Sequence, residues 1–403
     1  MGWNIKAAEN LAKGAVNSFK KESNKFIENT SNDINNYVNH TLNCLADIDQ
    51  IRIRAMERFI QYETGYVGAL IEAGIIPAKL VRMIQDQIFG TVKYDPPVMY
   101  RLAHPSCVWT GAPPELVPFD IRTEKPRKGV KPFIFVHGML YNQSKTSAYG
   151  FYKPFEKSVK MYRDKTSDND TDDVDIYILS YDSNITDETN LIIRRAIEAE
   201  IGTTVTGQST LIFLAILWRD LVERAREAGE IHLLPFFREI VRQDDRGSKS
   251  GIIVSHSLGN EAVAFAAQEL SYGPICDSWW CMAAALPADS FTNTGSYSHA
   301  PLISGTNDGS TIVWFSRTDA TLSSLYPLGN TAPNGEPMLA LGVTGALQHE
   351  YPLSNLDVSL CTDITHEVRQ GYFSKLSKNM RCRLGLEPWP ELLCELSIPN
   401  RRD

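Results

Sequence analysis

The sequence predicts an α/β fold in which helices cover both faces of a mostly parallel sheet, preceded by a helical N-terminal extension. After residue 131, short continuous apolar runs alternate with helical patterns, as is typical of strands buried on both faces. The chain has 403 residues, of which 43% are hydrophobic and 22% charged. That length exceeds what a single core needs, so we expect a three-layer α/β domain with an added part.

Residues 1–90 form the added part, because their apolar residues recur every three or four positions, as in amphipathic helices. This region carries ten Lys or Arg and ten Asp or Glu, so its charge cancels. We expect these helices to contact a membrane surface or a partner protein, to mediate oligomerisation or to cap a pocket, and the pattern does not select among these roles.

The remaining boundaries follow from composition. Residues 91–130 are rich in proline and predict an irregular connection, residues 131–385 hold the main domain, and residues 386–403 form a C-terminal tail. The strands expected in the main domain are "FIFVH" 133–137, "DIYILSY" 175–181, "GIIVS" 251–255, "WWCMAAAL" 279–286, "TIVWFS" 311–316 and "LDVSLC" 356–361.

Charge, cysteines and hydropathy exclude several classes of protein. A net charge of -8 argues against nucleic acid as a partner. The seven cysteines include no C-x-x-C pair, which argues against a disulfide framework or a zinc site. No secretory signal or membrane-spanning run is apparent, since the most apolar stretch, 209–218, is about half the length that a bilayer requires. We therefore expect a cytoplasmic protein, with export by a non-general route left open, and a buried helix over 209–218.

Ser257 lies in "GIIVSHSLGNEAVAF", on the turn between a buried strand and an amphipathic helix. A nucleophilic serine on such a tight turn requires small residues two positions before and after it, and Ser255 and Gly259 meet that requirement. The helix N-terminus would face a developing oxyanion, with the Leu258 amide as one donor. Because short patterns of small residues recur by chance, the strand before and the helix after Ser257 carry most of the weight.

A second donor is expected after the strand "FIFVH", where Gly138 permits a reversal of the chain. The amide of Met139 would then point toward the same cavity and complete a two-donor oxyanion hole.

A serine nucleophile needs a histidine base, and three histidines follow Ser257 in the chain: His299, His349 and His366. His366, in "DITHEVRQGYF", follows the last predicted strand and is the favoured base. His349 is the second choice, and His299, which precedes a strand, is poorly placed.

The base needs a carboxylate, and two aspartates follow predicted strands. Asp319 follows "TIVWFS" and Asp289 follows the strand before it. We favour Asp319, because the order serine, acid, histidine places the acid after the later strand. Asp289 stays the alternative, and an aspartate in such a loop is often only a helix cap or a solvated turn residue.

Together, "FVHGML", "SHSLGN", "FSRTDATL" and "DITHEVRQGYF" resemble the α/β-hydrolase superfamily, in particular its bacterial serine-hydrolase branches with an S-H-S-x-G elbow. The resemblance covers about residues 131–380. It implies the α/β-hydrolase fold, with Ser257 as nucleophile, Asp319 as acid, His366 as base, and the Met139 and Leu258 amides as oxyanion donors. The sequence departs from the family at Ser255, where most members have glycine.

The expected activity is cleavage of a carboxylic ester with a hydrophobic acyl group through an acyl-serine, as in a serine esterase, lipase or phospholipase. The insertions 182–250 and 320–353 are candidates for a lid or pocket wall. We expect no cofactor and no metal, because the motifs that bind them are missing. The alternative is an inactive hydrolase fold that serves as an interaction module through its N-terminal helices.

Overall fold

The structure is a computed structural model. It describes residues 94–103, 115–139, 141–166, 174–184, 207–243, 247–270, 273–305, 310–330, 338–348, 352–362, 366, 368 and 372. The sheet lies within one compact unit made of Lys93–Asn184, Trp218–Tyr326 and Met338–Asp403. The described residues of the second unit are 207–217 and 327–330.

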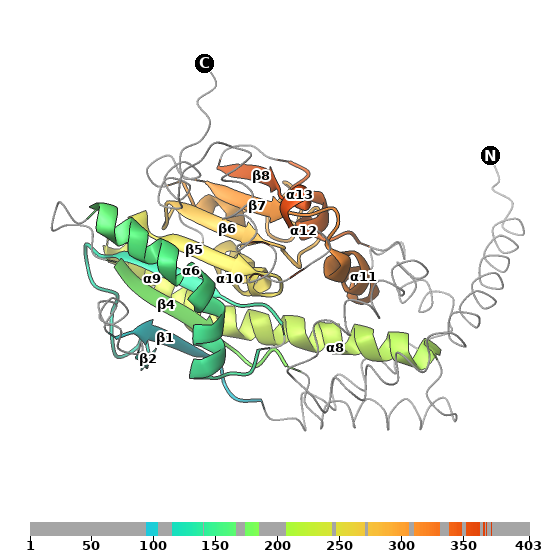
Figure 1. The fold of residues 1–403 in the computed structure, drawn as a ribbon, viewed down its shortest axis with the longest axis horizontal. Coiled ribbons are helices and arrows are strands. Elements are labelled where there is room, and N and C mark those ends of the chain that lie inside the picture. Colours follow the sequence, from blue (N-terminus) through green and yellow to red (C-terminus); the bar gives the residue numbers. More distant parts are fainter. Residues whose placement is uncertain are drawn as a thin grey trace, which may run out of the picture. The chain divides into compact units, whose positions relative to one another are not determined.

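An eight-stranded sheet in the order β2-β1-β4-β3-β5-β6-β7-β8 forms the core of the fold (Figure 1). Its strands are β1 Val98–Leu102, β2 Leu116–Phe119, β3 Lys131–Val136, β4 Val174–Ser180, β5 Ile252–His256, β6 Ser278–Met282, β7 Thr311–Phe315 and β8 Leu353–Asp357. The six strands from β3 to β8 pair in parallel, whereas β1 pairs antiparallel with both β2 and β4. The prediction of an α/β fold with a mostly parallel sheet is therefore confirmed.

The described helical segments connect and cover these strands. They are α6 Lys145–Thr166, α8 Gly207–Ala228, η1 Gly229–Leu233, α9 Leu234–Gln243, η2 Ser248–Ser250, α10 Gly259–Gln268, η3 Ala300–Ile303, α11 Ala320–Gly329, α12 Leu341–Thr344 and α13 Ser359–Thr362. None of the helices in the described part of the chain is both long enough and apolar enough to span a membrane.

Helices cover both faces of the sheet (Figure 1). On one face, Phe135 of β3 contacts Tyr152 and Phe155 of α6, with ring centroids 5.0 and 5.3 Å apart. On the other face, Tyr177 of β4 contacts Phe236 of α9 at 4.8 Å. Successive residues of a strand point to opposite faces of the sheet. Tyr177 pairs with Ile134, so its side chain lies on the face of Ile134 and not on that of the next residue, Phe135. The helices α6 and α9 therefore cover opposite faces.

The continuous apolar runs correspond to strands buried on both faces. Every residue of β4, β5, β6 and β7 is buried. The stacked indole rings of Trp280 and Trp314, 5.1 Å apart, join the two neighbouring strands β6 and β7. The runs lack polar alternation because neither face of these strands meets water.

Within the predicted irregular connection over residues 91–130, the structure has the two strands β1 and β2, whereas residues 120–130 lie in turns and irregular structure. These strands are short, and β2 is an edge strand that contains the exposed Pro118. An edge strand tolerates proline, since an edge residue needs no amide to pair outward. Proline content therefore masked a hairpin-like pair that ends the sheet.

The bounds of the last strand also differ from the prediction. The last strand is β8, at 353–357, and the predicted run 356–361 extends into α13 instead. The strand β8 lies at the edge of the sheet and is only partly buried, so it lacks the strong apolar run of its neighbours. The stretch 209–218 falls within α8, as expected for a helix.

Other expectations concern residues outside the described ones. These are the helices of residues 1–90, the tail 386–403, His349 and parts of both insertions, 182–250 and 320–353.

Candidate active site

Ser257 occupies a strained turn between β5 and α10. Its φ of 53° lies in the left-handed region, which residues other than glycine rarely adopt. The surrounding chain holds it there: the Ser257 amide donates to the carbonyl of Met282 at 3.0 Å, and the Ala285 amide donates to the carbonyl of Ser257 at 3.2 Å. Met282 is the last residue of β6, the neighbouring strand, and Ala285 lies three residues after it. Strain that is maintained in this way is common at functional sites.

Two glycines let the backbone approach Ser257 closely. A Cβ on Gly259 would lie 2.4 Å from the carbonyl oxygen of His137, and a Cβ on Gly138 would lie 2.6 Å from the Cβ of Ser257. Neither distance is sterically acceptable, so a side chain at either position would displace the backbone. The small residue expected two positions after Ser257 is therefore a steric requirement of this turn.

Ser255, the position where the sequence departs from the resembled family, has its own hydrogen bonds. Its hydroxyl donates to Asn260 Oδ1 at 2.6 Å and accepts from Trp279 Nε1 at 2.7 Å, with no exposed surface. The Asn260 amide nitrogen in turn donates to the carbonyls of Ser257 and Met282, each at 2.9 Å. Ser255 therefore supports the side chain that ties the turn to β6.

We expect Ser255→Ala to lower the free energy of unfolding by about 1–3 kcal/mol, because it leaves the buried Trp279 donor and Asn260 acceptor unpaired. Denaturant unfolding measures this difference. The matched control is Ser278→Ala, since the buried Ser278 hydroxyl on β6 has no hydrogen-bond partner among the described residues. Equal stability of the two variants would contradict the structural role of Ser255.

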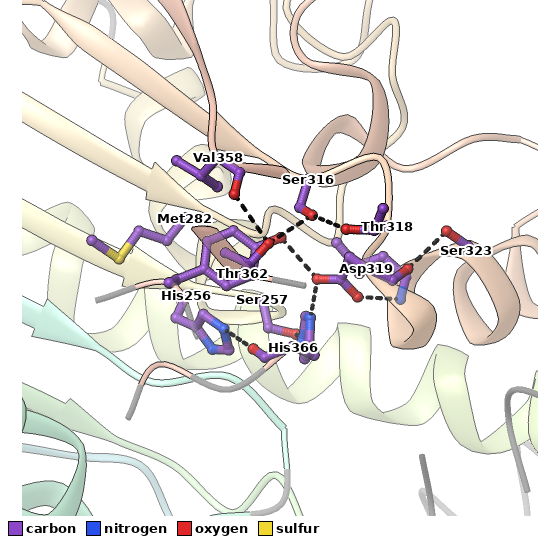
Figure 2. Close-up of polar contacts among 12 residues, drawn as sticks. His256, Ser257, Met282, Ser316, Thr318, Asp319, Ser323, Val358, Thr362 and His366 are labelled. Atoms are coloured by element: carbon purple, nitrogen blue, oxygen red, sulfur yellow. Dashed lines mark hydrogen bonds and ion pairs between the residues drawn. The ribbon is translucent and has the colours of Figure 1, made fainter. Parts of the chain in front are cut away.

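The structure brings together Ser257, His366 and Asp319 (Figure 2). His366 Nε2 lies 2.8 Å from Ser257 Oγ, and His366 Nδ1 lies 2.7 Å from Asp319 Oδ2. Asp319 is fully buried, and the side chain of His366 is 12% exposed. A carboxylate accepts only, so Nδ1 carries the proton and Nε2 is free to accept the hydroxyl proton of Ser257.

Asp319 is both a helix cap and the partner of His366. It directly precedes α11, and its Oδ1 accepts the Leu322 amide at 2.9 Å, while its backbone carbonyl accepts the Ser323 hydroxyl at 2.7 Å. Tyr372 adds a further hydrogen bond, from its hydroxyl to Asp319 Oδ2 at 2.8 Å. The cap and the contact with His366 therefore coexist, because the two carboxylate oxygens face different groups.

The alternative acid and one alternative base lie elsewhere. Asp289 is exposed, and its carbonyl accepts the Thr292 amide at 2.9 Å and hydroxyl at 2.8 Å. His299 is also exposed, and its amide donates to Gln268 Oε1 at 2.9 Å. In the described part of the chain, neither side chain contacts Ser257 or His366.

The loop after β3 lies against Ser257 and has a fixed peptide orientation. The carbonyl of Gly138 accepts His137 Nδ1 and the Ser183 hydroxyl, each at 2.8 Å. In a trans peptide the N–H points opposite to the C=O, so these two bonds also fix the direction of the Met139 amide. Among the described residues we find no acceptor for the amide of Met139 or for that of Leu258.

His137 is suited to this role because it is held neutral. It is fully buried, stacks on Tyr181 at 4.7 Å, and accepts the Tyr181 amide at Nε2. Burial lowers the pKa of His137 to about 4, against the opposing effect of its bond to Gly138. The proton therefore stays on Nδ1 at neutral pH, where it donates to the Gly138 carbonyl.

His256, the residue before Ser257, holds the backbone of His366. Its Nε2 donates to the His366 carbonyl at 2.7 Å, and the two rings lie 4.8 Å apart (Figure 2). Burial, together with the nearby His366, lowers the pKa of His256 well below its usual value, so the ring stays neutral.

Sequence reasoning overlooked five residues of this site: His256, His137, Ser183, Asn260 and Tyr372. Adjacency to the motifs could have signalled the two histidines and Asn260, whereas nothing local marks Ser183 or Tyr372.

The described residues contain no group of three or more His, Cys, Asp or Glu side chains that could hold a metal ion. A scan against protein-family models finds no model that matches this chain, and a search of curated proteins finds no match.

Proposed function

We propose that this protein is a serine hydrolase with the α/β-hydrolase fold that cleaves carboxylic esters through an acyl-serine intermediate. One observation carries the proposal: the continuous hydrogen-bonded chain from Ser257 Oγ through His366 to Asp319, with the serine on a strained strand-to-helix turn. Serine, histidine and aspartate in this geometry form the catalytic unit of acyl transfer on several unrelated folds. The strand order and the glycines at 138 and 259 add support.

In the acylation step, His366 Nε2 takes the proton of the Ser257 hydroxyl as Oγ attacks the ester carbonyl carbon. Asp319 stabilises the imidazolium that forms, because its Oδ2 already accepts the Nδ1 proton. The imidazolium then donates its Nε2 proton to the departing alkoxide, which leaves as an alcohol. The acyl group remains bonded to Ser257 Oγ.

The negative charge on the carbonyl oxygen needs donors that are in place before the reaction. We assign this role to the amides of Met139 and Leu258. The first is oriented by the bonds of His137 and Ser183 to the Gly138 carbonyl, and the second lies at the N-terminus of α10, where the helix dipole favours negative charge. Water then hydrolyses the acyl-serine with His366 as base.

We propose a hydrophobic acyl group for the substrate, as in an esterase or lipase. The supporting feature is the apolar composition of α11, the helix that directly follows Asp319. A panel of esters that differ in acyl length, with phospholipids included, identifies the preferred group. A preference for short polar acyl groups would contradict this assignment.

Labelling with a fluorophosphonate tests the proposed function directly, because this reagent forms a covalent bond with an activated serine. We expect the native protein to be labelled at Ser257 and Ser257→Ala to remain unlabelled, as shown by mass spectrometry of the peptides. Ser278→Ala, which changes a buried serine elsewhere on the sheet, should label like the native protein. Absence of labelling in well-folded native protein would overturn the proposal and favour an inactive hydrolase fold that acts as an interaction module.

A further inference from the structure

We propose that Tyr372 is a positioning residue that sets the basicity of His366 by sharing the carboxylate of Asp319. This inference rests on the function proposed above. Tyr372 donates to Asp319 Oδ2 at 2.8 Å, and the same oxygen accepts His366 Nδ1 at 2.7 Å. With the Leu322 amide on Oδ1, the carboxylate has three donors.

Burial makes this contact strong. Tyr372 and Asp319 have no exposed surface, so water does not compete for the carboxylate. Burial, reinforced by the charge of Asp319, raises the pKa of the Tyr372 hydroxyl well above its usual value. The hydroxyl therefore keeps its proton and remains a donor over the whole pH range in which an esterase works.

Two donors on one oxygen compete for its charge. A hydrogen bond from Tyr372 stabilises the ionised carboxylate and weakens its attraction for a cationic His366. Without the Tyr372 hydroxyl, the charge of Asp319 would be shared with one donor fewer, so Asp319 would attract the imidazolium more strongly. A carboxylate with one donor fewer would also be less firmly oriented toward Nδ1.

The titratable groups that lie against His366 in the described part of the chain come from three elements. Asp319 precedes α11, His256 ends β5, and Tyr372 follows His366 along the chain. Asp357, at the end of β8, acts on Tyr372 at longer range. His256 is neutral, so the charge that His366 senses is mainly that of Asp319, which Tyr372 modulates.

The test is the pH dependence of fluorophosphonate labelling at Ser257, whose rate constant requires neutral His366 and no knowledge of the substrate. For Tyr372→Phe we expect the acidic limb of the profile to shift upward by roughly half to one pH unit and the plateau rate to fall about tenfold. The matched control is Tyr177→Phe, which removes another buried tyrosine–carboxylate hydrogen bond, from Tyr177 to Asp175 at 3.3 Å on β4. The acidic limb of the labelling profile of Tyr177→Phe should lie at the same pH as that of the native protein.

A double-mutant cycle separates positioning from packing. If Tyr372 acts through Asp319, Tyr372→Phe should have little further effect on the rate in an Asp319→Asn background. Should Tyr372→Phe fail to fold, Tyr372→3-fluorotyrosine keeps the ring and strengthens the donor, and the acidic limb should then move downward. An unshifted limb in the folded variant, or additive effects in the cycle, would overturn the role of Tyr372. Failure of the native protein to label would instead overturn the proposed hydrolase function.

Discussion

His366→Ala is expected to reduce the turnover of p-nitrophenyl acetate by about 10⁴- to 10⁶-fold, the range found when the base of a serine triad is removed. His366 Nε2, 2.8 Å from Ser257 Oγ, is the only acceptor that the site provides, within the described residues, for the proton of the hydroxyl. Steady-state kinetics on purified protein, corrected for the uncatalysed rate, measure the loss. Circular dichroism verifies that the variant is folded.

The matched control for this change is His299→Ala. His299 is exposed and its amide contacts Gln268, away from Ser257, so its side chain should be dispensable for turnover. Comparable losses in the two variants would contradict the assignment of His366 as the base.

Asp319→Asn is expected to reduce the same activity by about 10⁴-fold while the fold is kept. The buried amide has the shape of the carboxylate but lacks its charge, so the imidazolium loses its stabilising partner. If the amide nitrogen faces His366, the ring must also present an unprotonated Nδ1, which places the proton on Nε2. In that tautomer the ring cannot accept the Ser257 proton.

The control here is Asp289→Asn, the same chemical change at the aspartate that follows β6. Asp289 is exposed and should tolerate the substitution with turnover close to the native value. A large loss in Asp289→Asn together with a native-like Asp319→Asn would show that the acid is misassigned.

Much of the sheet could be predicted because strands that are buried on both faces have a recognisable local sequence pattern. The runs 175–181 and 311–316 are mostly apolar and lack polar alternation, as strands do when helices cover both faces, and they correspond to β4 and β7. Edge strands have a weaker sequence pattern. The strand β2 contains Pro118 and was not predicted, and β8, which is only partly buried, was predicted to begin three residues too late. Edge strands are half solvated, and their sequences approach those of loops.

In the candidate site, the turn around Ser257 could be recognised from the sequence because its constraints are steric and local. A residue with φ of 53° that lies between a buried strand and a helix needs small neighbours, and these stand within two positions of it. By contrast, Tyr372 and Ser183 lie 53 and 45 residues from the atoms that they bind, in Asp319 and Gly138. Hydrogen bonds over such separations depend on how the strands are ordered, which no short pattern contains.

The sequence by itself determined the class of fold, the strand-to-helix turn that carries Ser257, and the short set of aspartates and histidines from which partners could come. These features follow from burial and backbone geometry over a few neighbouring residues. Tertiary structure distinguishes Asp319 from Asp289: of these two aspartates, the described residues show only Asp319, in the loop after β7, in contact with His366. It also placed Tyr372 on the Asp319 carboxylate and Ser183 on the Gly138 carbonyl. Those contacts join segments that the parallel sheet brings to one edge, and their physical cause is the order of the strands.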